Sequence, residues 1–173
     1  NPAAKGLKKS SPTQTLLPSK EVACGFMWKA GLHTKPDGRV CQVLPSRVFL
    51  SNSTDRFQAH WIKRHRLESV WLLADYSFIL FPVAKCPCFI GRYHTRHDGE
   101  PLGEFEFITP KVEPIDPREA LIPVQPEDQK VMSEQEIVTA AEKTACALVW
   151  KKHHWGTLRD LRLIERLMRL PKL

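Results

Sequence analysis

Apolar residues in this chain concentrate in short segments that are separated by turn-forming residues. Residues 22–30 and 39–50 are two such segments, and they flank the Lys-Pro-Asp-Gly sequence of residues 35–38. Pro presets φ, Asp bonds to nearby backbone and Gly accepts positive φ, so this sequence predicts a tight turn. The three stretches together predict a β-hairpin, with Pro45 near the end of its second strand.

A second hairpin is predicted from residues 88–93 and 103–109, which flank the Asp98-Gly99 dipeptide. Residues 104–108 alternate between Glu and apolar side chains, as a half-exposed strand does. Between the two hairpins, residues 70–81 are dense in aromatic and β-branched side chains. This composition predicts a buried strand, or two strands with a bend near Asp75.

Helical patterns occur in three places. Phe57 and Trp61 lie four residues apart within residues 53–68, which predicts a helix. The Ser-Glu-Gln-Glu sequence of residues 133–136 has the form of a capping box, and the apolar period after it predicts a helix to about Lys152. Gly156 interrupts this pattern, and a last helix is predicted from Thr157 to Leu170.

Two stretches are predicted to be extended. Residues 1–20 contain few large apolar side chains, and residues 110–131 contain five prolines, which neither a helix nor an interior strand tolerates. The expected organisation is a basic extended tail (1–20), a β-rich core domain with one helix (21–109), a Pro-rich acidic strap (110–132) and a C-terminal helical hairpin (133–173). The predicted fold class is α+β: a small antiparallel β core built from hairpins, followed by the strap and two C-terminal helices.

Composition and charge narrow the possible functions. The 173 residues are 42% hydrophobic, enough for a packed core, and no apolar run approaches the roughly 20 residues of a membrane span. The net charge is +7 and is uneven: residues 1–100 carry 15 basic and 7 acidic side chains, residues 101–136 carry 3 and 9, and residues 137–173 carry 8 and 3. Basic regions on either side of an acidic strap favour a polyanionic partner, with nucleic acid first.

Two clusters of cations are the predicted contacts, one around residues 56–66 and one in the last helix with the residues before it. Arginine forks bind phosphate in a bidentate manner, whereas Trp61 is expected in the core. The tail is expected to lie against an external partner. The predicted RNA-binding residues are Lys5, Lys8, Lys9, Arg56, Lys63, Arg64, Arg66, Lys151, Lys152, Arg159, Arg162, Arg166 and Arg169.

Cys86, Cys88, His94 and His97 are the weak candidates for a metal site. All four are residue types that bind zinc, but their spacing differs from that of a zinc knuckle, and the alternative is two buried thiols and two surface histidines. No other cofactor is expected. The odd count of five cysteines favours free thiols over a disulfide framework.

Catalytic motifs are absent from the sequence: it has no GxSxG, GxxxxGK[ST], GxGxxG or HExxH. Asp75 is the one acid in an unusual, apolar setting. We therefore expect no enzymatic activity and no small-molecule substrate.

In general character the chain resembles accessory proteins of organellar ribosomes, which are basic and combine tails and Pro-rich straps with a small mixed core. The resemblance implies a structural subunit in a mitochondrion that contacts rRNA and neighbouring proteins. Asn1 at the start fits removal of a mitochondrial presequence, and equally a truncation. The alternatives are an accessory subunit of another mitochondrial assembly, such as a respiratory or ATP synthase complex, and a small zinc-binding nucleic-acid module.

Overall fold

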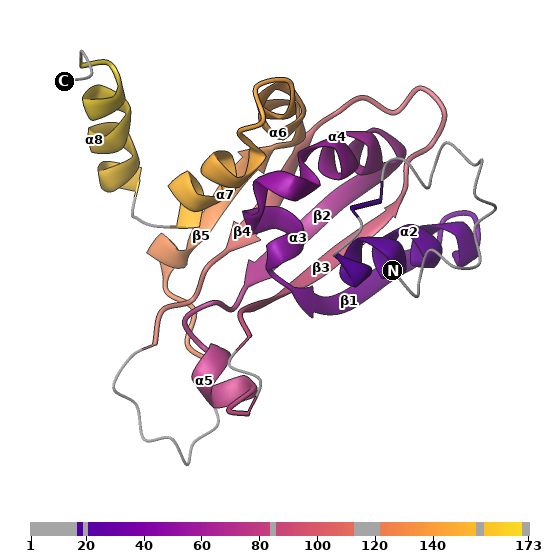
Figure 1. Cartoon of the computed structure of the whole chain (residues 1–173), viewed down its shortest axis with the longest axis horizontal. Helices are drawn as coiled ribbons and strands as arrows, with labels where there is room; N and C mark the ends of the chain where they lie inside the picture. Colours follow the sequence, from indigo (N-terminus) through magenta and orange to yellow (C-terminus); the bar gives the residue numbers. More distant parts are fainter. Residues whose placement is uncertain (1–16, 19–20, 84–85, 113–121, 155–157, 171–173) are drawn as a thin grey trace.

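A single five-stranded sheet organises the computed structural model, which describes residues 17–18, 21–83, 86–112, 122–154 and 158–170 (Figure 1). The strand order across the sheet is β1-β3-β2-β4-β5. The strands are β1 (Arg39–Pro45), β2 (His65–Leu72), β3 (Cys88–Thr95), β4 (Glu104–Ile108) and β5 (Gln129–Ser133).

The sheet is mixed, which corrects the expectation of an antiparallel core. β3 lies between β1 and β2 and is antiparallel to both, and β4 and β5 are also antiparallel. β2 and β4, however, are parallel, with Ser69 opposite Glu106. The prediction of an α+β fold is confirmed, but two of the pairs, β1 with β3 and β2 with β4, join strands that are not consecutive in the sequence.

The helices include two short 3-10 turns, η2 (Asn52–Thr54) and η4 (Pro126–Asp128). In Figure 1, α8 projects from the body of the molecule, and α5 lies at the end of the sheet that is reached by Leu72. The α-helices are α2 (Val22–His33), α3 (Arg47–Leu50), α4 (Asp55–Arg64), α5 (Ser77–Leu80), α6 (Glu134–Ala141), α7 (Cys146–His154) and α8 (Leu158–Met168). None of the described helices is long and apolar enough to cross a membrane.

The hydrophobic core lies between one face of the sheet and the layer formed by α2, α3, α4, α6 and α7 (Figure 1). Trp150 of α7 stacks on Phe49 with ring centroids 4.3 Å apart and also contacts Phe105 and Phe107 of β4. Its indole N–H donates to Gln58 Oε1 at 2.8 Å. The buried Gln58 side chain thus accepts a hydrogen bond from the only polar atom of the Trp150 side chain.

The opposite face of the sheet carries polar side chains. Because successive side chains of a strand alternate between faces, Arg92 and His94 of β3 point away from the helices, whereas Phe89 and Tyr93 enter the core. This polar face is where the charged residues of β1, β2 and β3 meet.

The prediction of a β-hairpin across residues 22–50 is wrong for its first strand. Residues 22–30 belong to helix α2, which buries Cys24, Met27 and Trp28 against the core. Their spacing of three and four residues fits a helix, and this tertiary burial outweighs the β-propensity of the segment. The turn itself is confirmed: Gly38 N–H donates to Lys35 O at 2.9 Å, and it is Asp37 that has positive φ, at 61°.

The middle of the chain differs from prediction in its boundaries. The predicted helix is present, but it ends at Arg64, and β2 starts directly at His65. Residues 70–81 are not one long strand, since β2 ends at Leu72 and α5 follows. β3 and β4 exist as predicted around a turn with Gly99 at φ 78°. They do not form a hairpin, because β2 lies between them.

The C-terminal third has more structure than predicted. The Pro-rich stretch ends in η4 and β5, so it is not extended throughout. The predicted helix from residue 134 to Lys152 is broken at Thr144, which has φ 52°, and three helices replace the two expected. Ser133 is the N-cap of α6 but makes no side-chain capping bond. Residues 1–16, 19–20 and 113–121 of the predicted tail and strap lie outside the described residues.

Candidate nucleic-acid interface and histidine cluster

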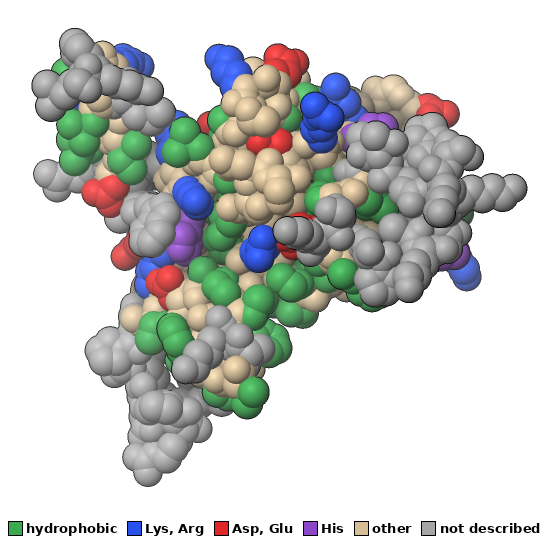
Figure 2. Space-filling view, viewed as in Figure 1, with side chains coloured by type: hydrophobic (Ala, Val, Ile, Leu, Met, Phe, Trp, Pro, Cys, Tyr) green, Lys and Arg blue, Asp and Glu red, His purple; other side chains and the backbone are tan. Residues whose placement is uncertain are grey.

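Helix α4 presents a row of exposed cations. It buries Phe57, Trp61 and Ile62 against the core, and the 3.6-residue period therefore places Arg56, Lys63 and Arg64 on the exposed side. Trp61 is in the core as expected. In Figure 2 blue side chains lie together over α4 at the upper edge of the molecule.

A groove of about 310 Å³ runs between α4 and α6 beside these cations. We call it the α4 groove. Its residues are Arg56, Ala59, His60 and Lys63 on one side and Val138, Ala141 and Glu142 on the other. Among the described residues, Arg56, Lys63 and Arg64 form no ion pair with an acidic side chain. Their charge is available to an anion from outside.

Trp28 of α2 supports the end of this row. The Arg64 guanidinium lies 5.3 Å from the Trp28 ring centroid. The His60 ring stacks on the same indole, with the two ring centroids 5.5 Å apart. Burial, together with the charges of Arg64 and Lys63, lowers the pKa of His60. His60 is therefore neutral at pH 7, and Trp28 is too buried to stack on a base.

Arg66 is separate from the α4 row. Its guanidinium donates to Glu104 O at 2.7 Å and lies 3.0 Å from Glu134 Oε2, with a side chain that is 23% exposed. Its charge is neutralised within the chain, so it acts in the packing of β2 rather than at an outer surface.

The C-terminal cations are partly paired. Lys152 contacts Glu165 at 2.8 Å and Glu136 at 4.0 Å, whereas Lys151 is exposed. Arg162 and Arg166 are exposed on α8, and Arg169 is exposed just after its end. The first two line a depression of about 320 Å³ with Asp160 and Leu163. Lys5, Lys8 and Lys9 and the side chain of Arg159 lie outside the described part.

The four metal candidates divide into two places. Cys88 is buried at the start of β3 and His94 is six residues further along the strand, about 20 Å away at the rise of an extended chain. Cys86 precedes the strand on the side of Cys88. The cysteines and the histidines therefore do not form one site.

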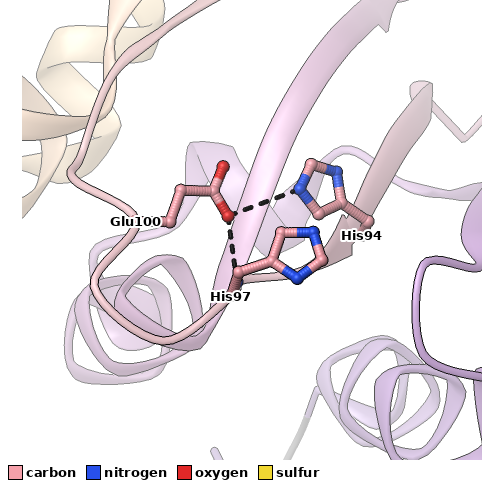
Figure 3. A group of neighbouring side chains, drawn as sticks. All are labelled: His94, His97 and Glu100. Carbon is pink, nitrogen blue, oxygen red and sulfur yellow. Dashed lines mark hydrogen bonds and ion pairs between the residues drawn. The ribbon is translucent and has the colours of Figure 1, made fainter.

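His94 and His97 instead meet Glu100, which the sequence analysis did not single out (Figure 3). His94 Nε2 lies 3.5 Å from Glu100 Oε2, and the same oxygen accepts the His97 backbone N–H at 3.0 Å. The cluster borders a pocket of about 170 Å³ that is also lined by Asp37 and Arg39. The turn at Asp98-Gly99, which the sequence did predict, is what returns Glu100 to His94.

Glu68 is the second residue that the sequence analysis missed. Burial would raise its pKa, but hydrogen bonds from Arg39, His94 and Arg92 outweigh burial and hold the pKa below its usual value. No local sequence signal reveals this role, because the three partners lie on β1 and β3.

No protein-family model matches the chain, and a comparison with curated proteins found no match. Among solved structures, a similar chain occurs in one described as "Structural basis underlying complex assembly and conformational transition of the type I R-M system", with a TM-score of 0.53 and 13% sequence identity. The similarity covers 84% of this chain and 38% of that chain, so this chain spans about two fifths of the length of the one it matches. At this identity the likeness shows the fold alone.

Proposed function

We propose that this chain is a non-catalytic, nucleic-acid-binding part of a multi-subunit assembly and that its ligand is duplex DNA. The observation that carries the proposal is the row of Arg56, Lys63 and Arg64, three exposed cations without an acidic partner among the described residues, beside the α4 groove. We choose duplex DNA because it presents a dense and regular line of phosphates to a fixed row of cations.

The physical basis is counterion release. Each phosphate that a lysine or arginine neutralises makes binding weaker as salt rises, with a slope of about −0.9 per contact for duplex DNA. Three contacts from the α4 row alone would weaken binding about 40-fold between about 50 and about 200 mM salt. Such contacts fix orientation on the backbone and carry no sequence preference.

The test is fluorescence anisotropy of a labelled DNA duplex titrated with the protein at several NaCl concentrations. We expect steep salt dependence for the wild type, and a large loss of affinity with a shallower slope for the triple variant Arg56→Glu, Lys63→Glu and Arg64→Glu. Lys35→Glu, a reversal of an exposed lysine in the loop before β1, is the matched control for the single variant Lys63→Glu.

Unchanged affinity of the triple variant would refute the α4 row as the interface. Loss of binding in Arg162→Glu with Arg166→Glu instead would place the contact on α8. Circular dichroism of each variant separates lost binding from lost folding.

An organellar ribosomal subunit is the second candidate, and the observation that favours it is the excess of basic residues over residues 1–100. It predicts contacts with rRNA and neighbouring proteins in the mitochondrial matrix. The same titration with a structured RNA decides between the two. Tighter binding of RNA than of DNA at equal salt would replace our proposal with this one.

A further inference from the structure

The turn after β3 assembles a set of three nitrogen and oxygen ligands. Glu100 N–H donates to His97 O at 3.1 Å and Gly99 has φ 78°, which folds the chain back onto the end of β3. As a result one ligand atom from each of His94, His97 and Glu100 lies within 4.8 Å of the other two (Figure 3).

The distances suit a small divalent ion. Zinc binds imidazole nitrogen and carboxylate oxygen at about 2.0–2.2 Å, so that ligands at the corners of a tetrahedron are about 3.3–3.5 Å apart. His94 Nε2 and Glu100 Oε2 already have this separation, 3.5 Å. The His97 side chain is 59% exposed and its Nε2 lies 3.7 Å from the exposed Asp37, so its ring is free of the core and has room to turn toward the other two ligands.

The surroundings orient the ligands as they do in known metal sites. His94 Nδ1 lies 3.1 Å from Glu68 Oε1, and Glu68 is itself held by Arg39 at 2.7 Å and Arg92 at 2.5 Å. A carboxylate held by two guanidinium groups only accepts hydrogen bonds, so His94 Nδ1 is the donor. With Nδ1 bound to Glu68, Nε2 is the ring nitrogen of His94 that remains for a metal ion, as in a carboxylate–histidine–metal relay.

We propose that His94, His97 and Glu100 bind a divalent transition-metal ion of the zinc class, with Glu68 as the residue that positions His94. Three protein ligands leave a coordination position for water or for a ligand from outside. Cys86 and Cys88 take no part, because they lie at the other end of β3. The site lies on the polar face of the sheet, so it is independent of the proposed DNA contact on α4.

The test is isothermal titration calorimetry with Zn²⁺ alone on metal-free protein without a polyhistidine tag, supported by the visible absorption of bound Co²⁺. We expect one ion per chain for the wild type and loss of that binding in His94→Ala and in Glu100→Gln. Glu68→Gln keeps all three ligands and should weaken binding about 10- to 100-fold. His33→Ala, an exposed histidine at the end of α2, and Cys88→Ser should bind as the wild type does.

Absence of saturable binding by the wild type would overturn the proposal. So would full binding by His94→Ala, or loss of binding by Cys88→Ser with a wild-type fold. Circular dichroism identifies unfolded variants. For any variant that fails to fold, the NMR signals of the His94 and His97 rings in the wild type decide: they shift on Zn²⁺ addition if the site exists and stay unchanged if it does not.

Discussion

Glu134 is a single carboxylate on which donors from three distant segments converge. Its side chain is fully buried, and Oε1 accepts the Leu67 backbone N–H at 2.8 Å. Oε2 accepts the Gly103 N–H at 2.9 Å and Arg96 Nη2 at 2.8 Å, and it lies 3.0 Å from Arg66 Nη1. These bonds join the N-terminus of α6 to β2 and to the segments on either side of the turn after β3. They also explain the register shift of β2 between Leu67 and Ser69, where the carboxylate takes a backbone donor.

The Glu134→Gln variant tests how much these contacts of Glu134 contribute to the free energy of unfolding. Removing the charge leaves the buried Arg96 without its counterion, whereas Arg66 keeps Glu100 at 3.7 Å. The loss of the buried pair costs about 3–5 kcal/mol of the free energy of unfolding. Urea denaturation followed by tryptophan fluorescence measures the loss. Glu142→Gln, an exposed carboxylate just after the same helix, should change stability by less than about 0.5 kcal/mol. A loss below about 1 kcal/mol for Glu134→Gln would contradict the ionised network.

At the scale of elements, the structure departs from the sequence prediction mainly in how strands pair. Local chemistry predicted the turns at residues 35–38 and at Asp98-Gly99 and the helix that begins at Asp55, because turn and helix signals reside in neighbouring residues. Strand order depends on packing between distant segments, and nothing local indicates that β2 inserts between β3 and β4. The prediction of a strand at residues 22–30 was wrong because aromatic and apolar side chains are common both in strands and in buried helices such as α2.

The same distinction applies to the candidate site. His94 and His97 were found from residue type, and Glu100 was within reach of the same reasoning, since it follows His97 by three residues across a predicted turn. Glu68 was out of reach because it acts through cross-strand contacts. Arg56, Lys63 and Arg64 were singled out from the density of basic residues in this stretch, and the period of the buried residues of α4 accounts for their exposure.

The break between α6 and α7 offers a test at this scale. Thr144 has φ 52°, a left-handed conformation that a β-branched residue adopts at a cost of about 1 kcal/mol or more. Thr144→Gly removes the Cβ and should raise the free energy of unfolding by about 1 kcal/mol, as measured by urea denaturation. Thr139→Gly, an exposed position inside α6, should lower it by about 0.5–1 kcal/mol. A loss of stability in Thr144→Gly would show that its side chain contributes more than the strain costs.

At the scale of the whole molecule, two buried histidines make stability depend on pH. His65 stacks on Trp61 with centroids 4.6 Å apart, and burial lowers its pKa to about 4. Burial likewise lowers the pKa of His154 to about 4. In the unfolded chain both histidines have a pKa of about 6.5. Between about pH 6.5 and about pH 4 they are therefore protonated in the unfolded state but neutral in the folded state, and proton binding favours unfolding. Stability is therefore retained above about pH 6.5 and lost as the pH falls toward 4.

We expect the free energy of unfolding to fall by about 2 kcal/mol per buried histidine between pH 7 and pH 5. Urea denaturation at the two pH values measures the difference. His65→Gln keeps an amide that can donate to Trp61 O, as His65 Nδ1 does at 3.0 Å, and should reduce the pH-dependent loss by about half, whatever its effect at pH 7. Equal stability of the wild type at both pH values would mean that these rings accept protons in the folded state.

The contacts of Glu134 also determine when parts of the fold can be completed during synthesis of the chain. Glu134 follows Arg96 by 38 residues and Leu67 by 67. At a translation rate of about 5–20 residues per second, the nascent chain waits from about two to more than ten seconds for the carboxylate that completes β2 and the segment after β3. β4 is synthesised within that interval, but until Glu134 follows, the Leu67 backbone N–H and the Arg96 guanidinium lack the carboxylate that binds them. This part of β2 is therefore a natural place for a chaperone to bind.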